Sequence, residues 1–331
     1  KTFNDPIEYY REKLISIIIS KKQKILKNAL QIVPSYWHEK DNKGKIVMHG
    51  KDGSLVDKFL KVDFSKITDT FLSSVKNHFT ETVKAIKLLW ENELYYCDLK
   101  LENVLYEKNG TEDKTYLADI GGVTYFNEEV DMDFFKSIKE YDLYIEKESL
   151  KMYLGYDDKF GIVSDDWREK IDGTIIETDD YYFQIITNET LSGTIKLSSS
   201  TSIFTYPLTK GGVVDLDKSE IENKLILLNN IFHSIIVFLF ILLSGEKYYF
   251  LFDDHDISES VIKVNSWINM SELKPEIKSK LKKLTNYLKF QSDNINNFLD
   301  LDCNIVEMND ENIEKKFDDI ISLVENIDKY E

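Results

Sequence analysis

Two short stretches of the chain carry side chains of the types used in phosphoryl transfer. Asp98 and Asn103 lie five positions apart in the run 96–105, which reads Tyr-Cys-Asp-Leu-Lys-Leu-Glu-Asn-Val-Leu, and Asp119 follows in Leu-Ala-Asp-Ile-Gly. A carboxylate near an acceptor hydroxyl can take its proton, while an amide and a carboxylate can converge on a Mg²⁺ ion that bridges phosphates. Each residue alone is more often a cap or a turn former, so the chemistry depends on their combination.

This combination resembles the catalytic core of the protein kinase superfamily. The signature of that family has an Asp base, a metal-binding Asn five positions later, and then a second metal-binding Asp before a Gly. Asp98, Asn103 and Asp119 match it in type, order and spacing. The resemblance implies that Asp98 orients the acceptor hydroxyl and that Asn103 and Asp119 hold Mg²⁺. It also implies that Lys100 lies near the γ-phosphate of ATP.

Regular elements are predicted on both sides of these residues. Apolar side chains at helical spacing predict a long amphipathic helix over 69–90, and the chain turns extended from Tyr95. Two short strands, 103–106 and 115–118, are predicted to flank the turn Lys108-Asn-Gly110. The site residues would then lie in the connections around a hairpin.

Upstream, the pattern predicts a helix, a hairpin and a short second helix. Residues 5–29 show helical spacing, and the runs 31–37 and 45–48 are β-like around the turn signal 41–44. Gly53-Ser54 is predicted to open a short helix that ends near Leu60.

The kinase resemblance extends into this region. It places adenine against Met48, His49 and Gly50, at the end of a strand, and it makes Lys1 the phosphate-binding lysine with Glu12 as its helix partner. A Met and a His in a strand are about as often ordinary core or surface residues. A terminal Lys and a helical Glu are most often solvated, so both readings stay open.

Three features depart from the family pattern. Tyr96-Cys97 stands where His-Arg is expected, so the arginine that reads an activation-loop phosphate is absent, and no G-x-G-x-x-G occurs in the chain. Cys97 is expected to be a small buried hydrophobe rather than a reactive thiol. An acidic insert at about 127–200 lengthens the segment after Asp119, either as a docking or autoinhibitory element, for example for a regulatory partner, or as a surface elaboration.

Beyond Glu220 the pattern is helical to the C-terminus. The most apolar run, 235–243, has nine residues, whereas crossing a bilayer needs about 20, so we expect a buried core helix and no membrane span. The predicted fold class is α+β, a protein-kinase-like two-lobed fold. Residues 1–50 would form a small, partly truncated N-lobe with antiparallel strands and one helix, and residues 51–331 a mainly helical C-lobe with the insert.

Composition excludes several classes of protein. The chain has 331 residues, 42 % of them hydrophobic, and a net charge of −17, which would repel the backbone of a nucleic acid. Its two cysteines, 206 positions apart, provide neither a disulfide framework nor a CxxC pair and indicate a reducing compartment such as the cytoplasm.

The sequence therefore predicts an ATP- and Mg²⁺-dependent protein kinase that acts on Ser/Thr hydroxyls of a protein substrate. Two other readings remain. One is a pseudokinase-like protein whose role is nucleotide binding or scaffolding, and the other is a kinase-fold enzyme that phosphorylates a small molecule or transfers a nucleotide.

Overall fold

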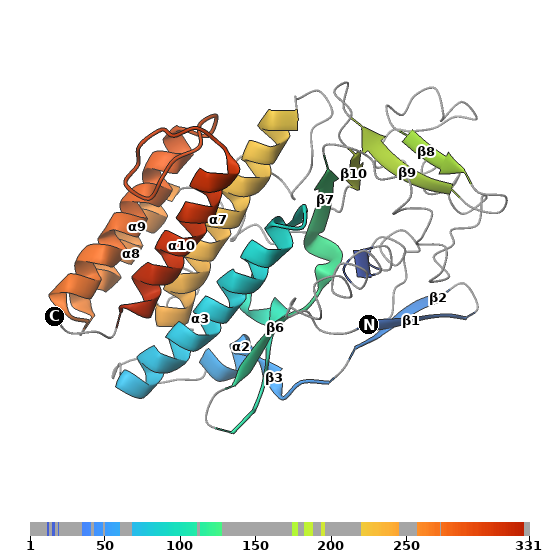
Figure 1. Ribbon diagram of the computed structural model, residues 1–331. Helices are drawn as coiled ribbons and strands as arrows, with labels where there is room; N and C mark the ends of the chain where they lie inside the picture. The colour runs from blue at the N-terminus through green and yellow to red at the C-terminus, as the bar shows by residue number, and fades with distance from the viewer. Residues whose placement is uncertain are drawn as a thin grey trace.

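The fold is mixed α+β and mostly helical, as the sequence predicts (Figure 1). The computed structural model describes residues 50–59, 68–110, 113–127, 220–244, 257–271 and 273–327, the strands at 35–40, 43–48, 174–177, 182–187 and 193–195, and the helical positions 12, 15, 16 and 19. Lys1, His49 and most of the insert lie outside the described residues. The long helices lie alongside one another on one side of the molecule, and the strands lie on the other.

Helix α3 (Asp69–Trp90) has the predicted bounds. The Oγ1 atom of Thr68 accepts a hydrogen bond from the backbone N–H of Phe71 at 3.1 Å and so caps the first turn. The apolar face of the helix is buried, and the ring of Phe79 stacks on that of Phe238 with 6.4 Å between centroids. This face joins α3 to the central helix of the molecule.

That central helix is α7 (Glu220–Ser244), which is longer than the nine-residue run noted in the sequence. Its segment Lys224–Ser244 is long and apolar enough to cross a membrane by length and composition alone, but 89 % of this window is buried inside the protein. The predicted core helix is therefore confirmed, and packing within the molecule accounts for its apolar sequence.

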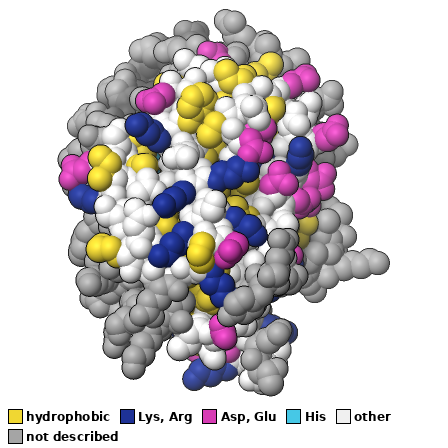
Figure 2. Space-filling view, turned by 90° about the vertical axis from the view of Figure 1, so that its left-hand side faces the viewer, with side chains coloured by type: hydrophobic (Ala, Val, Ile, Leu, Met, Phe, Trp, Pro, Cys, Tyr) yellow, Lys and Arg dark blue, Asp and Glu magenta, His cyan; other side chains and the backbone are white. Residues whose placement is uncertain are grey.

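Near the C-terminal end, the described residues form the helices α8 (Ile257–Met270), α9 (Pro275–Asp293) and α10 (Asp310–Glu325). Figure 2 shows the face formed mainly by α8 and α9, where lysine side chains gather near the middle and carboxylates lie toward the margin. The exposed lysines of α9 are Lys280, Lys282, Lys283 and Lys289. Lysines are thus concentrated on this face of a chain whose net charge is −17, and one of them, Lys283, pairs with Asp302.

One lysine of α10 is buried instead. Lys316 is 2 % exposed, and its Nζ atom donates to the Tyr287 hydroxyl at 2.6 Å. The same atom lies 4.2 Å from the ring centroid of Phe232 and 4.4 Å from that of Phe298. Burial lowers the pKa of Lys316 well below its usual value. The aromatic rings and the hydroxyl are the contacts of this buried amino group.

The strands that the structure describes form three antiparallel groups. β1 (Ser35–Lys40) pairs with β2 (Lys43–Met48), which confirms the predicted hairpin with its first strand shifted toward the turn. β3 (Gly53–Ser54), β5 (Val104–Glu107) and β6 (Lys114–Leu117) form a second sheet. The third has the order β4 (Leu94–Tyr96), β7 (Val123–Asn127), β10 (Gly193–Ile195), β9 (Tyr182–Thr187), β8 (Thr174–Glu177), so the insert, unassigned from sequence, contributes three strands.

The predicted short helix is confirmed, but Gly53-Ser54 forms a strand before it and not its first residues. Gly53 pairs with Tyr106 in the sheet, and helix α2 spans only Leu55–Phe59. The Asp57 carboxylate accepts a hydrogen bond from the Ser54 backbone N–H at 3.3 Å, so the helix begins directly after the strand. A two-residue strand depends on a partner about 50 residues away, which local pattern does not reveal.

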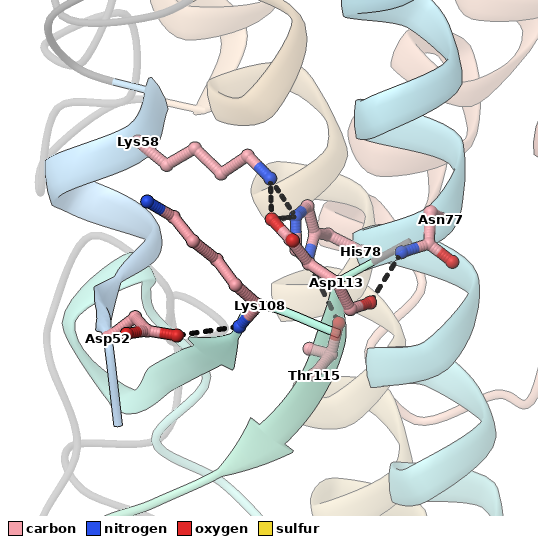
Figure 3. A network of polar contacts seen from close by, with 7 residues as sticks. All are labelled: Asp52, Lys58, Asn77, His78, Lys108, Asp113 and Thr115. Atoms are coloured by element: carbon pink, nitrogen blue, oxygen red, sulfur yellow. Dashed lines mark hydrogen bonds and ion pairs between the residues drawn. The ribbon is translucent and has the colours of Figure 1, made fainter. Parts of the chain in front are cut away.

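A polar network joins α2, α3 and the start of β6 (Figure 3). The Lys58 ammonium lies 2.8 Å from Nε2 of His78 and also pairs with Asp113. An ammonium can only donate, so Nε2 accepts, and Nδ1 carries the proton that is donated to the Thr115 hydroxyl at 2.9 Å. Burial, and then the charge of Lys58, lower the pKa of His78 to about 4, while Asp113 opposes the shift. His78 is therefore a neutral connector.

This network predicts acid sensitivity of the fold. The pKa of His78 rises from about 4 in the folded chain to its ordinary 6.5 on unfolding, so the unfolded state binds more protons and stability falls as pH drops below 6.5. The loss between pH 7 and pH 5 is about 2 kcal/mol for this one group. Denaturant unfolding at both pH values should therefore show a smaller pH-dependent loss in His78→Gln than in wild type. Equal losses would contradict the assignment.

Candidate functional site

Four of the predicted site residues, Asp98, Lys100, Asn103 and Asp119, lie in two connections that the strand pairing places opposite each other. β5 and β6 form an inner hairpin in which Val104 faces Leu117, and β4 and β7 form an outer pair in which Tyr96 faces Val123. Residues 97–103, here the first arm, connect β4 to β5, and residues 118–122, the second arm, connect β6 to β7. The first arm carries Asp98, Lys100 and Asn103, and the second carries Asp119.

Hydrogen bonds to Ala118 join the second arm to the first arm and to the end of β4. The backbone N–H of Ala118 donates to the carbonyl of Asn103 at 2.8 Å. The carbonyl of Ala118 accepts from the hydroxyl of Tyr96, at the end of β4, at 2.7 Å. The residue directly before Asp119 is therefore fixed through both of its backbone polar groups.

Within the first arm, the Asp98 carboxylate is the centre of the hydrogen bonding. Its Oδ2 atom accepts from Nζ of Lys100 at 2.9 Å and from Nδ2 of Asn103 at 2.8 Å. Nδ2 of Asn103 also donates to the Asp98 carbonyl at 2.9 Å. Both Asp98 and Asn103 are nearly buried, at 3 % and 4 % exposed. These charge-assisted bonds hold the carboxylate in one orientation and leave Oδ1 of Asn103 as the amide atom suited to a cation.

Asp119 has an unusual backbone. Its φ of 50° and ψ of 65° lie in the left-handed region, directly before the short 3-10 turn Ile120–Gly122. Aspartate and asparagine adopt this region more readily than other residues with a Cβ atom. Glu93 and Cys303, which lie outside the two arms, have a positive φ as well.

Glu12 is buried at 3 % exposed and belongs to the same neighbourhood. The pKa of Tyr96 is raised well above its usual value, first by burial, then by the charges of Asp98 and Asp119, and less by that of Glu12. Three carboxylates from three segments of the chain therefore act on one buried hydroxyl. The role of Glu12 as the helix partner of Lys1, which lies outside the described residues, stays a prediction.

The predicted adenine contacts are only partly visible. Met48 is half-buried at the end of β2. Gly50 is exposed, and the position that a Cβ atom would occupy there has open space for 4 Å around it. His49 and Lys1 lie outside the described residues. Adenine binding at 48–50 therefore stays a prediction.

Cys97 is a buried thiol, as expected. Its Sγ atom lies 3.7 Å from the carbonyl of Tyr95, and burial, helped by the charge of Asp98, raises its pKa to about 12. The side chain is therefore uncharged at neutral pH and fills space in the first arm.

Asn103 and Asp119 are compared here with the ligands that Mg²⁺ prefers. Among the residues that the structure describes, no group of three or more His, Cys, Asp or Glu side chains could hold a metal ion. Mg²⁺ usually keeps several waters and binds through one or two carboxylates together with substrate phosphates. One amide and one carboxylate, from Asn103 and Asp119, are consistent with that mode.

Tyr96 is the site residue that sequence reasoning missed. The sequence shows it only as a replacement of the family's His, two positions before Asp98. Its bond to Ala118 depends on the pairing of β4 with β7, which brings together residues 22 positions apart. The only signal that the sequence offered was a tyrosine shortly before an acidic loop.

Comparison with known proteins does not add to this geometry. No protein-family model matches the chain, and no curated protein is similar to it in sequence.

Proposed function

We propose that the chain is an ATP- and Mg²⁺-dependent protein kinase with a kinase-like two-lobed fold, which transfers the γ-phosphate to Ser/Thr hydroxyls. The observation that carries the proposal is the pair of arms joined at Ala118, which brings Asp98, Asn103 and Asp119 to one place. The same residues match the kinase signature in order and spacing.

Each residue has a defined task in this proposal. Asp98, held by Lys100 and Asn103, accepts or orients the proton of the acceptor hydroxyl. Lys100 adds positive charge beside the transferred group. Asn103 and Asp119 would hold Mg²⁺, which supplies charge neutralisation for the phosphates when it is bound with ATP.

The remaining assignments come from the family resemblance. Residues 1–50 would be the small lobe and 51–331 the large lobe. Lys1, paired with Glu12, would bind the α- and β-phosphates, and residues 48–50 would contact adenine. The burial of Glu12 and the effect of its charge on the pKa of Tyr96 are in keeping with this placement.

A transfer assay tests the proposal directly. Wild-type protein is incubated with γ-labelled ATP, Mg²⁺ and a mixture of basic and acidic test proteins, and the label is located on Ser or Thr by phosphoamino-acid analysis. We expect labelled protein in the complete reaction and no labelled protein when EDTA is present from the start. Label only on a small molecule, or transfer from α-labelled ATP, would favour the small-molecule or nucleotide-transfer reading.

A nucleotide-binding or scaffold protein is the second candidate. The replacement of His-Arg by Tyr96-Cys97 favours it. The retention of Asp98, Asn103 and Asp119 together favours the enzyme, because a scaffold needs none of their chemistry. Mg²⁺·ATP binding without any transfer would support the scaffold reading.

The proposal also predicts activity that does not depend on phosphorylation. The chain has two arginines, Arg11 and Arg168, and neither is beside Asp98 in the sequence, so a phosphate in the insert lacks its usual partner there. Control by the insert at 127–200, or by a partner bound to it, is expected instead. Phosphatase treatment should change the transfer rate less than about twofold relative to mock treatment, because no phosphate-binding arginine next to Asp98 orders the segment. A large fall in rate would show that phosphate gating operates through other cations.

A further inference from the structure

Helix α9 carries a run of lysines that no acidic residue interrupts. Residues 277–292 contain five lysines and no Asp or Glu, although the net charge of the chain is −17. Lys278 and Lys282 are four positions apart, a spacing at which like charges repel each other on a helix. The run therefore does not serve the stability of the helix itself.

Most of this charge has no countercharge in the part of the chain that the structure describes. Lys283 pairs with Asp302, and Nζ of Lys278 donates to the carbonyl of Asn269 at 3.0 Å, which leaves its charge in place. Three exposed lysines of α9 form no ion pair with any described residue, namely Lys280, Lys282 and Lys289. A partner that neutralises them must be anionic.

Two of these lysines lie along the seam between α8 and α9. Lys282, Thr285 and Lys289 follow one another at spacings of three and four, which places them on one face of α9. The Thr285 hydroxyl lies 3.0 Å from Oδ1 of Asn265 on α8, so this face is the one beside α8. Ile262 precedes Asn265 by three positions and lies on the same side of α8. Positive charges and an apolar side chain thus border the same seam.

Exposed apolar side chains accompany the lysines. Among the described residues, five large apolar side chains are exposed, and three of them belong to α8 and α9. These three are Ile262, Met270 and Phe290, at 66 %, 73 % and 41 % exposed. Phe290 directly follows Lys289, and Figure 2 shows apolar side chains among the lysines of this face. Such a mixture is typical of a surface that lies on a bilayer, where lysines attract anionic headgroups and apolar side chains enter the interface.

The kind of cation favours a lipid surface over an acidic protein segment. The chain has two arginines, Arg11 and Arg168, and neither belongs to α8 or α9. Arginine recognises one carboxylate or phosphate in a fixed geometry through its planar fork, whereas lysine acts as a point charge on a flexible stem. Lysines alone suit a fluid layer of anionic headgroups, which presents charge without a fixed arrangement.

We propose that the lysine face, formed by Lys280, Lys282, Lys289, Ile262 and Phe290, is a docking surface for an anionic lipid bilayer. The lysines would lie against the headgroups, and the two apolar side chains would enter the boundary of the acyl chains. The contact is peripheral, because the apolar segment of α7 is mostly buried inside the protein. The docking surface involves neither arm of the candidate site, so the inference does not depend on the proposed function.

Sedimentation with vesicles tests the proposal on the 331-residue chain. Vesicles of equal parts phosphatidylserine and phosphatidylcholine should bind the protein, and vesicles of phosphatidylcholine alone should not. Binding should weaken as salt rises from about 0.1 M to about 1 M, because the screening length falls from about 10 Å to about 3 Å. Each lysine near an anionic leaflet contributes about fivefold to partitioning, so replacing Lys280, Lys282 and Lys289 together by Gln should weaken binding about 100-fold.

A matched control removes the same charge elsewhere. Lys84, Lys108 and Lys114 are exposed on α3 and on the β5–β6 hairpin, and their joint replacement by Gln should leave binding within about twofold of wild type. An equal loss in both triple variants would show that only net charge matters and would overturn the docking face. Glutamine is close to lysine in helix propensity, so the α9 variant is expected to fold, and its denaturant midpoint checks this.

The apolar part of the face has its own variant. Ile262→Ser with Phe290→Ser should weaken vesicle binding by a factor that does not change with salt, because burial of apolar surface is not screened. This variant keeps every lysine and so decides the matter if the lysine variant does not fold. Unchanged binding in it would contradict the proposal.

Two results with wild type would also overturn the lipid assignment. One is the absence of binding to the phosphatidylserine vesicles at low salt. The other is binding to a polyglutamate peptide but not to vesicles, which would identify the lysine face as a site for an acidic protein segment.

Discussion

Replacing Asp98 by asparagine is expected to slow phosphoryl transfer by about 10²- to 10⁴-fold while leaving the affinity for Mg²⁺·ATP nearly unchanged. The carboxylate is nearly buried and held by Lys100 and Asn103, and in the proposed function it acts on the acceptor hydroxyl rather than on ATP. Asparagine preserves the size of the side chain but cannot accept a proton. The measurement is the steady-state rate with γ-labelled ATP, together with the Kd for Mg²⁺·ATP.

Asp113→Asn is the matched control for this variant. Asp113 also pairs with a lysine, Lys58, but it belongs to the network that joins α2, α3 and β6 and not to either arm. Its loss should affect stability and leave the transfer rate near that of wild type. A rate in Asp98→Asn within a few-fold of wild type would remove Asp98 from the role of base.

The elements that local sequence determines were predicted well. The bounds of α3 follow from Thr68 as a cap, from Asp69 in the first turn and from helical periodicity, all of which are local. The same holds for the turn before β6, where Gly110 has a φ of 69°, a value suited to glycine. Such features depend on neighbours within a few residues.

Features that depend on distant pairing were not predicted. The strand at Gly53-Ser54 exists because residues 105–106 lie beside it, and the Tyr96 bond exists because β4 pairs with β7. The candidate site shows the same division. Residue types and spacing identified Asp98, Asn103 and Asp119, whereas the left-handed backbone of Asp119 and the role of Ala118 follow from the arrangement of the two arms.

The second large effect is expected at Asp119. Mg²⁺·ATP at about 100 times its Kd should stabilise wild type by about 2.7 kcal/mol, which corresponds to a rise in Tm of several degrees. Asp119→Ala should show almost no Mg²⁺-dependent part of this rise, because the carboxylate that would join metal and phosphates is gone.

The Asp119 backbone determines how this experiment must be designed. Alanine is disfavoured at a φ of 50°, so Asp119→Ala is expected to be less stable even without ligand, and the ligand-induced shift, not the Tm itself, is the quantity to compare. Asp119→Asn is the better partner variant, because asparagine tolerates the left-handed region while removing the charge. Both variants should lose the Mg²⁺-dependent shift, and Asp119→Asn should keep a ligand-free Tm closer to that of wild type. If both retain the full shift, Asp119 is not a metal ligand.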